Sequence, residues 1–156
     1  MKLKTIEVYE YKELSEKAKK KARNWLLECQ DFEFEWDCIK DDAKEVGIKL
    51  TAWEYCRYAE GELLLDMTQV IANILKEHGE PCETYKTAKE YQAKYALLTE
   101  EQDEERETLE IEFTKAILED YRIQADRQYE FIQSEEAVAE TMEANEYEFD
   151  INGKRI

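Results

Sequence analysis

The chain has 156 residues and carries 39 acidic against 22 basic residues, which gives a formal net charge of −17. This excess of negative charge argues against direct binding to nucleic acid, because phosphates repel it, and against attachment to an anionic membrane surface. It favours partners that present a basic surface.

Other classes of protein are disfavoured by what the sequence lacks. Four glycines and one proline are too few for glycine-rich phosphate loops or a many-turned β architecture. No apolar run reaches the ~20 residues of a membrane-spanning helix, and the first five residues lead into no hydrophobic signal-peptide core. Because the four cysteines form no CxxC pair, we expect reduced thiols and a cytoplasmic protein.

The first half of the chain predicts a small antiparallel sheet packed with helices. Segments rich in β-branched and aromatic residues predict strands, and apolar residues at helical spacing predict helices. The expected strands are 3–11, 48–56 and 61–66, and the expected helices are 15–28, 32–46 and 68–78. Gly47 supplies a stop for the second helix, and Pro81 prevents the third from resuming.

From about residue 84 the chain becomes mainly helical. Helices are expected over 84–98, about 100–132 and 135–144. Thr99 with Gln102 predicts a capping box at the start of the long helix. Residues 147–151 predict a strand that returns beside the first one, and Asn152-Gly153 is typical of a type I′ hairpin turn.

Together these elements predict an α+β fold with a long C-terminal helical pair. We expect an α+β core over residues 1–83 and a long acidic helical region over 84–156. The long helix carries one apolar stripe with Leu109, Phe113 and Ile117, and a second, narrower stripe formed by Ile111, Leu118 and Ala125. Two stripes indicate two neighbours: either both belong to the same chain, or one is a second protomer in a homodimer through the long helices.

Negative charge is concentrated in the second half. Residues 100–150 hold 19 acidic and 4 basic residues, and residues 100–112 alone hold 8 acidic residues and one arginine. As a helix, 13 residues span about 20 Å, so the net charge is about one per 3 Å, which is close to the ~3.4 Å spacing of a single DNA strand.

This density fits either a solvated face or a surface that imitates nucleic acid. The candidate partner-binding residues are Glu100, Glu101, Asp103, Glu104, Glu105, Glu107, Glu110, Glu112, Glu119 and Asp120.

Residues suited to catalysis are scarce. His78 is the only histidine, so no serine or cysteine has an evident base other than this one. Asp37, Asp41 and Glu45 share a helix face that could hold a hard cation, but a solvated face is the simpler interpretation. We therefore expect no enzyme activity, no metal and no cofactor.

Segments spread along the chain resemble a known family. They are KTIEVYEYKELSEKAKKKARNW, WDCIKDDAKEVG, KEHGEPCETYKTAKEY, AILEDYRIQADRQYEF and ANEYEFDINGKR. These are similar to small proteins of bacteriophages and prophages that often carry the label "antitoxin of toxin–antitoxin stability system". The resemblance implies a phage-linked setting in the host cytoplasm, where small acidic proteins commonly block host defences, sometimes by imitating DNA.

Three functions are then open. The chain is an interaction protein that inhibits a host defence complex, of anti-CRISPR or anti-restriction type, by occupying its basic nucleic-acid-binding surface with the acidic region. Alternatively, it is an antitoxin-like module that covers a basic toxin. The third alternative is a sponge for a nucleotide signal, for which the only basic cluster lies between Lys17 and Arg23 on the first helix.

Overall fold

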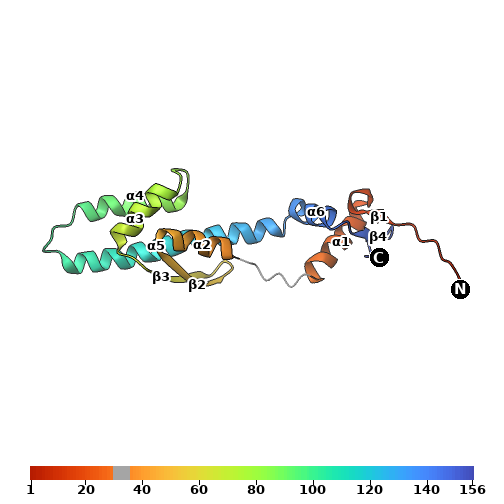
Figure 1. Ribbon diagram of the computed structural model, residues 1–156, viewed down its shortest axis with the longest axis horizontal. Helices are drawn as coiled ribbons and strands as arrows, with labels where there is room; N and C mark the ends of the chain where they lie inside the picture. The colour runs from red at the N-terminus through yellow and green to blue at the C-terminus, as the bar shows by residue number, and fades with distance from the viewer. Residues whose placement is uncertain (30–35) are drawn as a thin grey trace. The chain divides into compact units, whose positions relative to one another are not determined.

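The computed structural model describes residues 1–29 and 36–156 (Figure 1). Over these residues it contains six α-helices and two antiparallel sheets of two strands each, and this confirms the α+β class. Of the helices in this part of the chain, none has the length and apolar character needed to cross a lipid bilayer.

The described residues form two compact units. The terminal unit is built from residues 1–29 together with 128–156, and the central unit is built from residues 36–127. This division differs from the expected boundary between residues 83 and 84. The reason is that the C-terminal elements share their core with the N-terminal ones, while the fourth helix and most of the fifth pack in the central unit.

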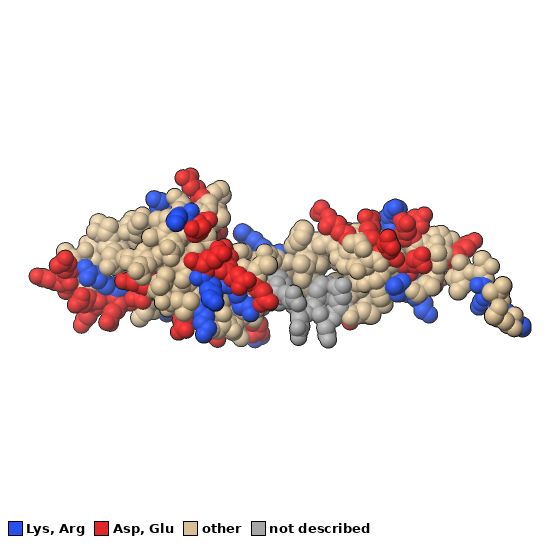
Figure 2. Space-filling model, viewed as in Figure 1, with Lys and Arg blue, Asp and Glu red and all other residues tan. Residues whose placement is uncertain are grey.

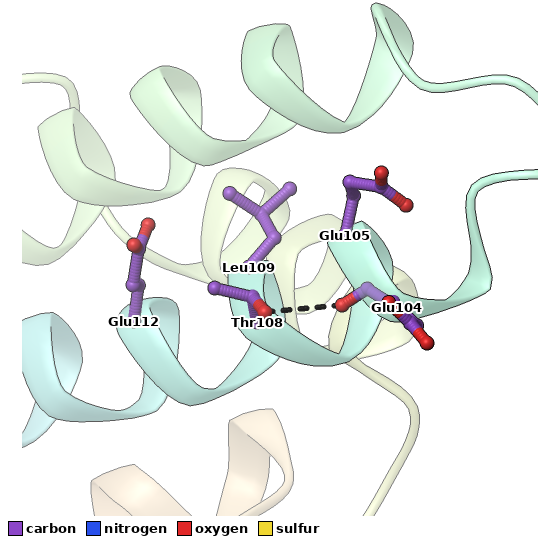
Figure 3. A pocket seen from close by; sticks show the side chains of 5 residues that line it. All are labelled: Glu104, Glu105, Thr108, Leu109 and Glu112. Carbon is purple, nitrogen blue, oxygen red and sulfur yellow. Dashed lines mark hydrogen bonds between the residues drawn. The ribbon is translucent and has the colours of Figure 1, made fainter.

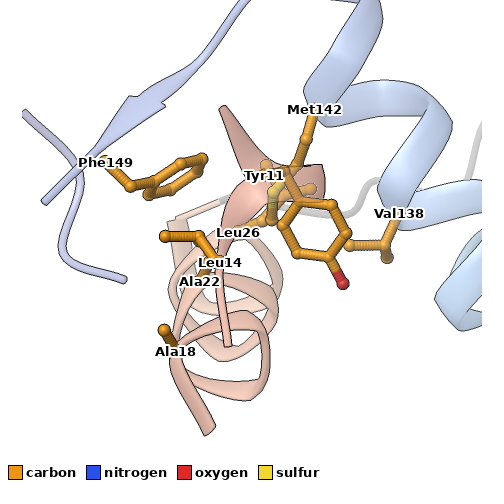
Figure 4. Packing of buried hydrophobic residues seen from close by; sticks show 8 residues of the cluster. All are labelled: Tyr11, Leu14, Ala18, Ala22, Leu26, Val138, Met142 and Phe149. Atoms are coloured by element: carbon orange, nitrogen blue, oxygen red, sulfur yellow. The ribbon is translucent and has the colours of Figure 1, made fainter. Parts of the chain in front are cut away.

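The terminal unit combines both ends of the chain around one apolar cluster. Its elements are β1 (Tyr9–Glu10), a 3-10 helix (Tyr11–Glu13), α1 (Glu16–Cys29), α6 (Glu135–Ala144) and β4 (Glu148–Phe149). Ala18, Ala22 and Leu26 recur at four-residue spacing on α1 and pack with side chains from α6 and β4 (Figure 4). The buried members are Tyr11, Leu14, Ala18, Ala22, Leu26, Val138, Met142 and Phe149.

The predicted return of the C-terminal strand to the first strand is confirmed. Tyr9 pairs with Phe149 and Glu10 with Glu148 in antiparallel register. The first strand is much shorter than the expected 3–11. Ile6 and Val8, which alternate onto one face of the expected strand, lie before the observed strand and are exposed.

The turn after β4 is not the expected type I′ hairpin. That turn needs positive φ at both central residues, whereas Gly153 has φ +81° and Asn152 is not in the left-handed region. Instead, the Asp150 carboxylate accepts the backbone amides of Asn152 and Lys154, both at 2.9 Å. A β-bridge between Phe149 and Arg155 then continues the sheet.

The central unit packs helices against a β-hairpin. It contains α2 (Asp37–Val46), β2 (Ile48–Glu54), β3 (Tyr58–Leu63), α3 (Met67–Glu77), α4 (Glu83–Ala96) and most of α5 (Asp103–Ile132). In the hairpin, Ile48 lies opposite Leu63 and Trp53 opposite Ala59. The expected helix over 32–46 is observed from Asp37, and its residues before 36 lie outside the described part of the chain.

Local signals set the element boundaries here. Gly47 adopts φ +96° after α2 and donates its amide to the carbonyls of Ala43 and Lys44, as expected for a helix stop. Asp66 caps α3 by accepting the amide of Thr68 at 3.4 Å. At the start of α5, the Thr99 amide donates to the Gln102 side chain at 2.8 Å, which is half of the predicted capping box.

Candidate partner-binding surface

The acidic helix α5 is held in place by α4, with which it forms the predicted long helical pair. Thr87 donates to Asp120, Tyr91 packs edge-on against Phe113, and Arg106 lies over the ring of Tyr95. Residue numbers rise along one helix while they fall along the other, so the two helices are antiparallel. The buried residues of α5 in the central unit form one stripe: Leu109, Phe113, Ile117, Tyr121, Ala125 and Asp126.

The second apolar stripe of α5 does not form a continuous surface. Ala125 is buried, and Leu118 lies against β3, because a Cβ on Gly61 would be 3.1 Å from Leu118 Cδ2. Only Ile111 remains open, with 58% of its surface exposed. Contacts within one chain therefore account for most residues of the two apolar stripes. A homodimer through the long helices stays a prediction.

Eight of the ten candidate carboxylates gather at the N-terminal end of α5, and all eight are exposed. Glu100 and Glu101 lie in the turn before the helix, and the other six lie within its first ten residues. Figure 2 shows acidic side chains crowding this end of the helical pair. The positive end of the helix dipole favours the three acidic residues of the first turn: Asp103, Glu104 and Glu105.

These carboxylates lie on two flanks of α5 rather than in a single row. On one flank, Glu105 and Glu112 stand on either side of Leu109, and with Glu104 and Thr108 they line a shallow hollow of about 280 Å³ (Figure 3). The Thr108 hydroxyl donates to the backbone carbonyl of Glu104 at 3.0 Å, so it does not hydrogen-bond to these carboxylates.

The opposite flank has a mixed character. Glu107 and Glu110 line a hollow of about 440 Å³ with the exposed Ile111, Thr114 and Lys115. On this flank, acidic side chains therefore lie beside the exposed apolar side chain of Ile111. Such a combination suits a protein partner with basic side chains around an apolar contact.

The eight carboxylates have few basic partners within their own chain. Among the described residues, the one ion pair that they form joins Asp103 to Arg106 at 3.8 Å. We define the acidic surface as the eight residues Glu100, Glu101, Asp103, Glu104, Glu105, Glu107, Glu110 and Glu112.

The other two candidate residues are set apart from this surface. Glu119 accepts two bonds from Arg122, at 2.9 and 2.6 Å, and this pairing lowers its pKa. Asp120 is half-buried and accepts the Thr87 hydroxyl at 2.5 Å, while burial raises its pKa. Both carboxylates serve contacts inside the central unit, so they are not equivalent to the eight.

The carboxylates do not converge as metal ligands do. In the described part of the chain, no group of three or more His, Cys, Asp or Glu side chains is arranged to hold a metal ion. Asp37, Asp41 and Glu45 are exposed on α2.

A polar cluster that sequence reasoning missed surrounds His78. Its Nδ1 lies 2.6 Å from the Thr84 hydroxyl, its Nε2 lies 3.3 Å from Asp42, and Tyr121 donates to the same carboxylate at 3.3 Å. The hydrogen bond with His78 lowers the pKa of Asp42, and burial raises that of Tyr121. A hydroxyl, an imidazole and a carboxylate in this order suggest a nucleophile and its base. Thr84 is only 5% exposed, however, so its hydroxyl is largely enclosed within the central unit.

A second missed cluster centres on Asp126, which is 7% exposed. Its carboxylate accepts the indole N–H of Trp53 at 3.0 Å, the backbone amide of Cys56 and a guanidinium N–H of Arg122 at 2.5 Å. Cys56 has φ +57°, an uncommon conformation for a residue with a side chain. Through these hydrogen bonds, Asp126 connects the turn between β2 and β3 to α5. The i,i+4 spacing of Arg122 and Asp126 is a sequence signal for their ion pair, but no local signal indicates the contacts with Trp53 and Cys56.

Comparison with protein-family models, with curated proteins and with solved structures finds no match to this chain. The case for a function therefore depends on the surface itself.

Proposed function

We propose that this chain is a non-enzymatic inhibitor that binds the basic, nucleic-acid-binding surface of a host defence complex through the acidic surface of α5. The observation that carries this proposal is the exposure of eight carboxylates, of which only Asp103 pairs with a basic side chain among the described residues.

The energetics of this arrangement support a binding role. Like charges at four-residue spacing within α5, such as Asp103 and Glu107, destabilise a helix by a few tenths of a kcal/mol each. The helix dipole offsets part of this cost in the first turn only, so Glu107, Glu110 and Glu112 receive little compensation. Arginine and lysine side chains of a partner would supply it through charge-assisted hydrogen bonds.

The test compares two charge-reversed variants with equal changes in net charge. Glu107→Lys/Glu110→Lys/Glu112→Lys alters the acidic surface beyond the first helical turn. Glu136→Lys/Glu140→Lys/Glu143→Lys alters exposed carboxylates of α6. Each tagged protein is used to capture partners from a nuclease-treated bacterial lysate at low and high salt, and the captured proteins are identified by mass spectrometry.

We expect the wild type and the α6 variant to capture the same nucleic-acid-binding complex and the α5 variant to lose it. High salt should weaken the capture, because the Debye length shrinks from about 10 Å at 0.1 M to 3 Å at 1 M. Equal capture by the α5 variant would rule out the proposal. Capture of a small basic protein instead of a complex would favour the antitoxin-like alternative.

A further inference from the structure

The described basic residues of α1 separate onto two faces with different surroundings. Lys19 pairs with Glu16 and lies over the ring of Tyr11, and Arg23 bonds the Tyr11 hydroxyl and pairs with Glu135. These two cations are thus engaged within the terminal unit. Lys17, Lys20 and Lys21 form no ion pair with the described residues and are exposed.

The three unpaired lysines share one hollow. With Asn24 they follow the i, i+3, i+4, i+7 spacing of a single helix face, and the other wall comes from Ile151 and Asn152 in the turn after β4. The hollow encloses about 460 Å³, within the range of roughly 300–1,000 Å³ that is typical of small-molecule sites.

Close backbone packing and hydrogen bonds hold the wall of this hollow in place. A Cβ on Gly153 would lie 2.1 Å from the Ala18 carbonyl oxygen, so the turn backbone packs directly against the first turn of α1. Asp150 fixes the turn through the amides of Asn152 and Lys154. Ser15 also lines the hollow and caps α1 by accepting the amide of Ala18 at 3.2 Å.

The chemistry of the lining is that of an anion site. Three ammonium groups and two side-chain amides offer donors, and Lys17 lies in the first turn of α1, at the positive end of the helix dipole. The nearby carboxylate of Asp150 is held by backbone amides, and Lys21 contributes to lowering its pKa. Lys17 and Lys21 are one helical turn apart, about 6 Å along the axis, so their ammonium groups can contact different phosphate groups of one ligand.

We propose that this hollow binds a small molecule that carries two or more linked phosphate groups, with Lys17, Lys20 and Lys21 as its charge partners and the amides of Asn24 and Asn152 as further donors. This site lies in the terminal unit and is independent of the acidic surface of α5. The negative charge of the rest of the chain opposes anion binding, so the affinity depends on these three lysines and falls as salt rises.

The experiment is a titration of the ¹⁵N-labelled full chain with sodium pyrophosphate and, separately, with metal-free ADP, followed by NMR. The reporting signals are the side-chain amides of Asn24 and Asn152 and the backbone amide of Gly153. We expect saturable shifts at these signals. Tighter binding of ADP than of pyrophosphate would show that the site also recognises a nucleoside.

Lysine variants distinguish a specific anion site from non-specific attraction of the anion to surface lysines. Lys17→Gln/Lys20→Gln/Lys21→Gln should bind pyrophosphate at least about tenfold more weakly, whereas Lys44→Gln/Lys49→Gln/Lys76→Gln, with the same loss of charge in the central unit, should bind as the wild type does. Replacing the first three lysines by arginine should retain binding, since the charge is kept. Shifts that do not saturate, or equal weakening in both glutamine variants, would overturn the proposal.

Discussion

Two carboxylates join parts of the central unit that are far apart in the sequence. Asp126 bonds Trp53, which is 73 residues away, and Asp42 accepts the hydroxyl of Tyr121, which is 79 residues away. Each carboxylate accepts hydrogen bonds from another element of the unit, and buried polar groups in proteins are generally hydrogen-bonded. The stability of the unit should therefore be sensitive to both.

Replacing Asp126 by alanine should destabilise the central unit by about 2–3 kcal/mol, because a charged acceptor that is only 7% exposed and holds three donors is lost. The measurement is the free energy of unfolding in urea, followed by circular dichroism. Asp41→Ala, an exposed position on α2, is the control and should change the stability by less than about 0.5 kcal/mol. Equal effects of the two substitutions would show that Asp126 does not fasten the hairpin.

The contribution of Asp42 should depend on pH. Its pKa is lowered below the ordinary value of 3.8 by the hydrogen bond with His78, so the folded chain holds its proton less tightly than the unfolded chain does. The stabilisation is therefore complete above that value and is lost as the pH falls through the folded-state pKa. The difference in unfolding free energy between wild type and Asp42→Asn should shrink as the pH falls below about pH 4. A difference that stays unchanged through this acid range would contradict this assignment.

At the scale of the element, the charge crowding on α5 should reduce its stability. Glu105→Gln/Glu112→Gln removes two charges from one flank and should stabilise the chain by about 0.3–1 kcal/mol at low salt, since like charges are relieved. The gain should disappear in 0.5 M salt, because screening removes the repulsion in the wild type as well. A gain that persists at high salt would mean that the effect is not electrostatic.

The turn after β4 should tolerate no side chain at Gly153. Alanine there must adopt φ +81° and would place its Cβ against the Ala18 carbonyl, so we expect a loss of more than about 1 kcal/mol. Gly79→Ala is a matched control, because its nearest atom would lie 3.5 Å away at ordinary φ. Amide hydrogen exchange in α1 reports on the terminal unit and should accelerate only in the first variant.

At the scale of the whole molecule, the elements were predictable because their signals are local. Gly47, Ser134 and the four-residue spacing of Leu109, Phe113 and Ile117 each act within a few residues. The division into units was not predictable, because it depends on which apolar faces meet. The polar partners of Asp126 and the separation of the α1 lysines onto two faces likewise arise only from long-range packing.

This division leads to a last prediction. Among the described residues, the central unit has buried apolar side chains of its own, with Ile39, Val46, Ile74, Phe113 and Tyr121 all less than 2% exposed. A fragment of residues 36–127 should therefore fold alone and unfold cooperatively in urea. A fragment that ends at residue 118 lacks Tyr121, Ala125 and Asp126, and should fail to fold because the Asp126 cluster, the hydrogen bond from Tyr121 to Asp42 and the end of the α5 stripe are lost. If the longer fragment also gave the far-UV spectrum of an unfolded chain, the central unit would need the chain ends, and the two cores would not be independent.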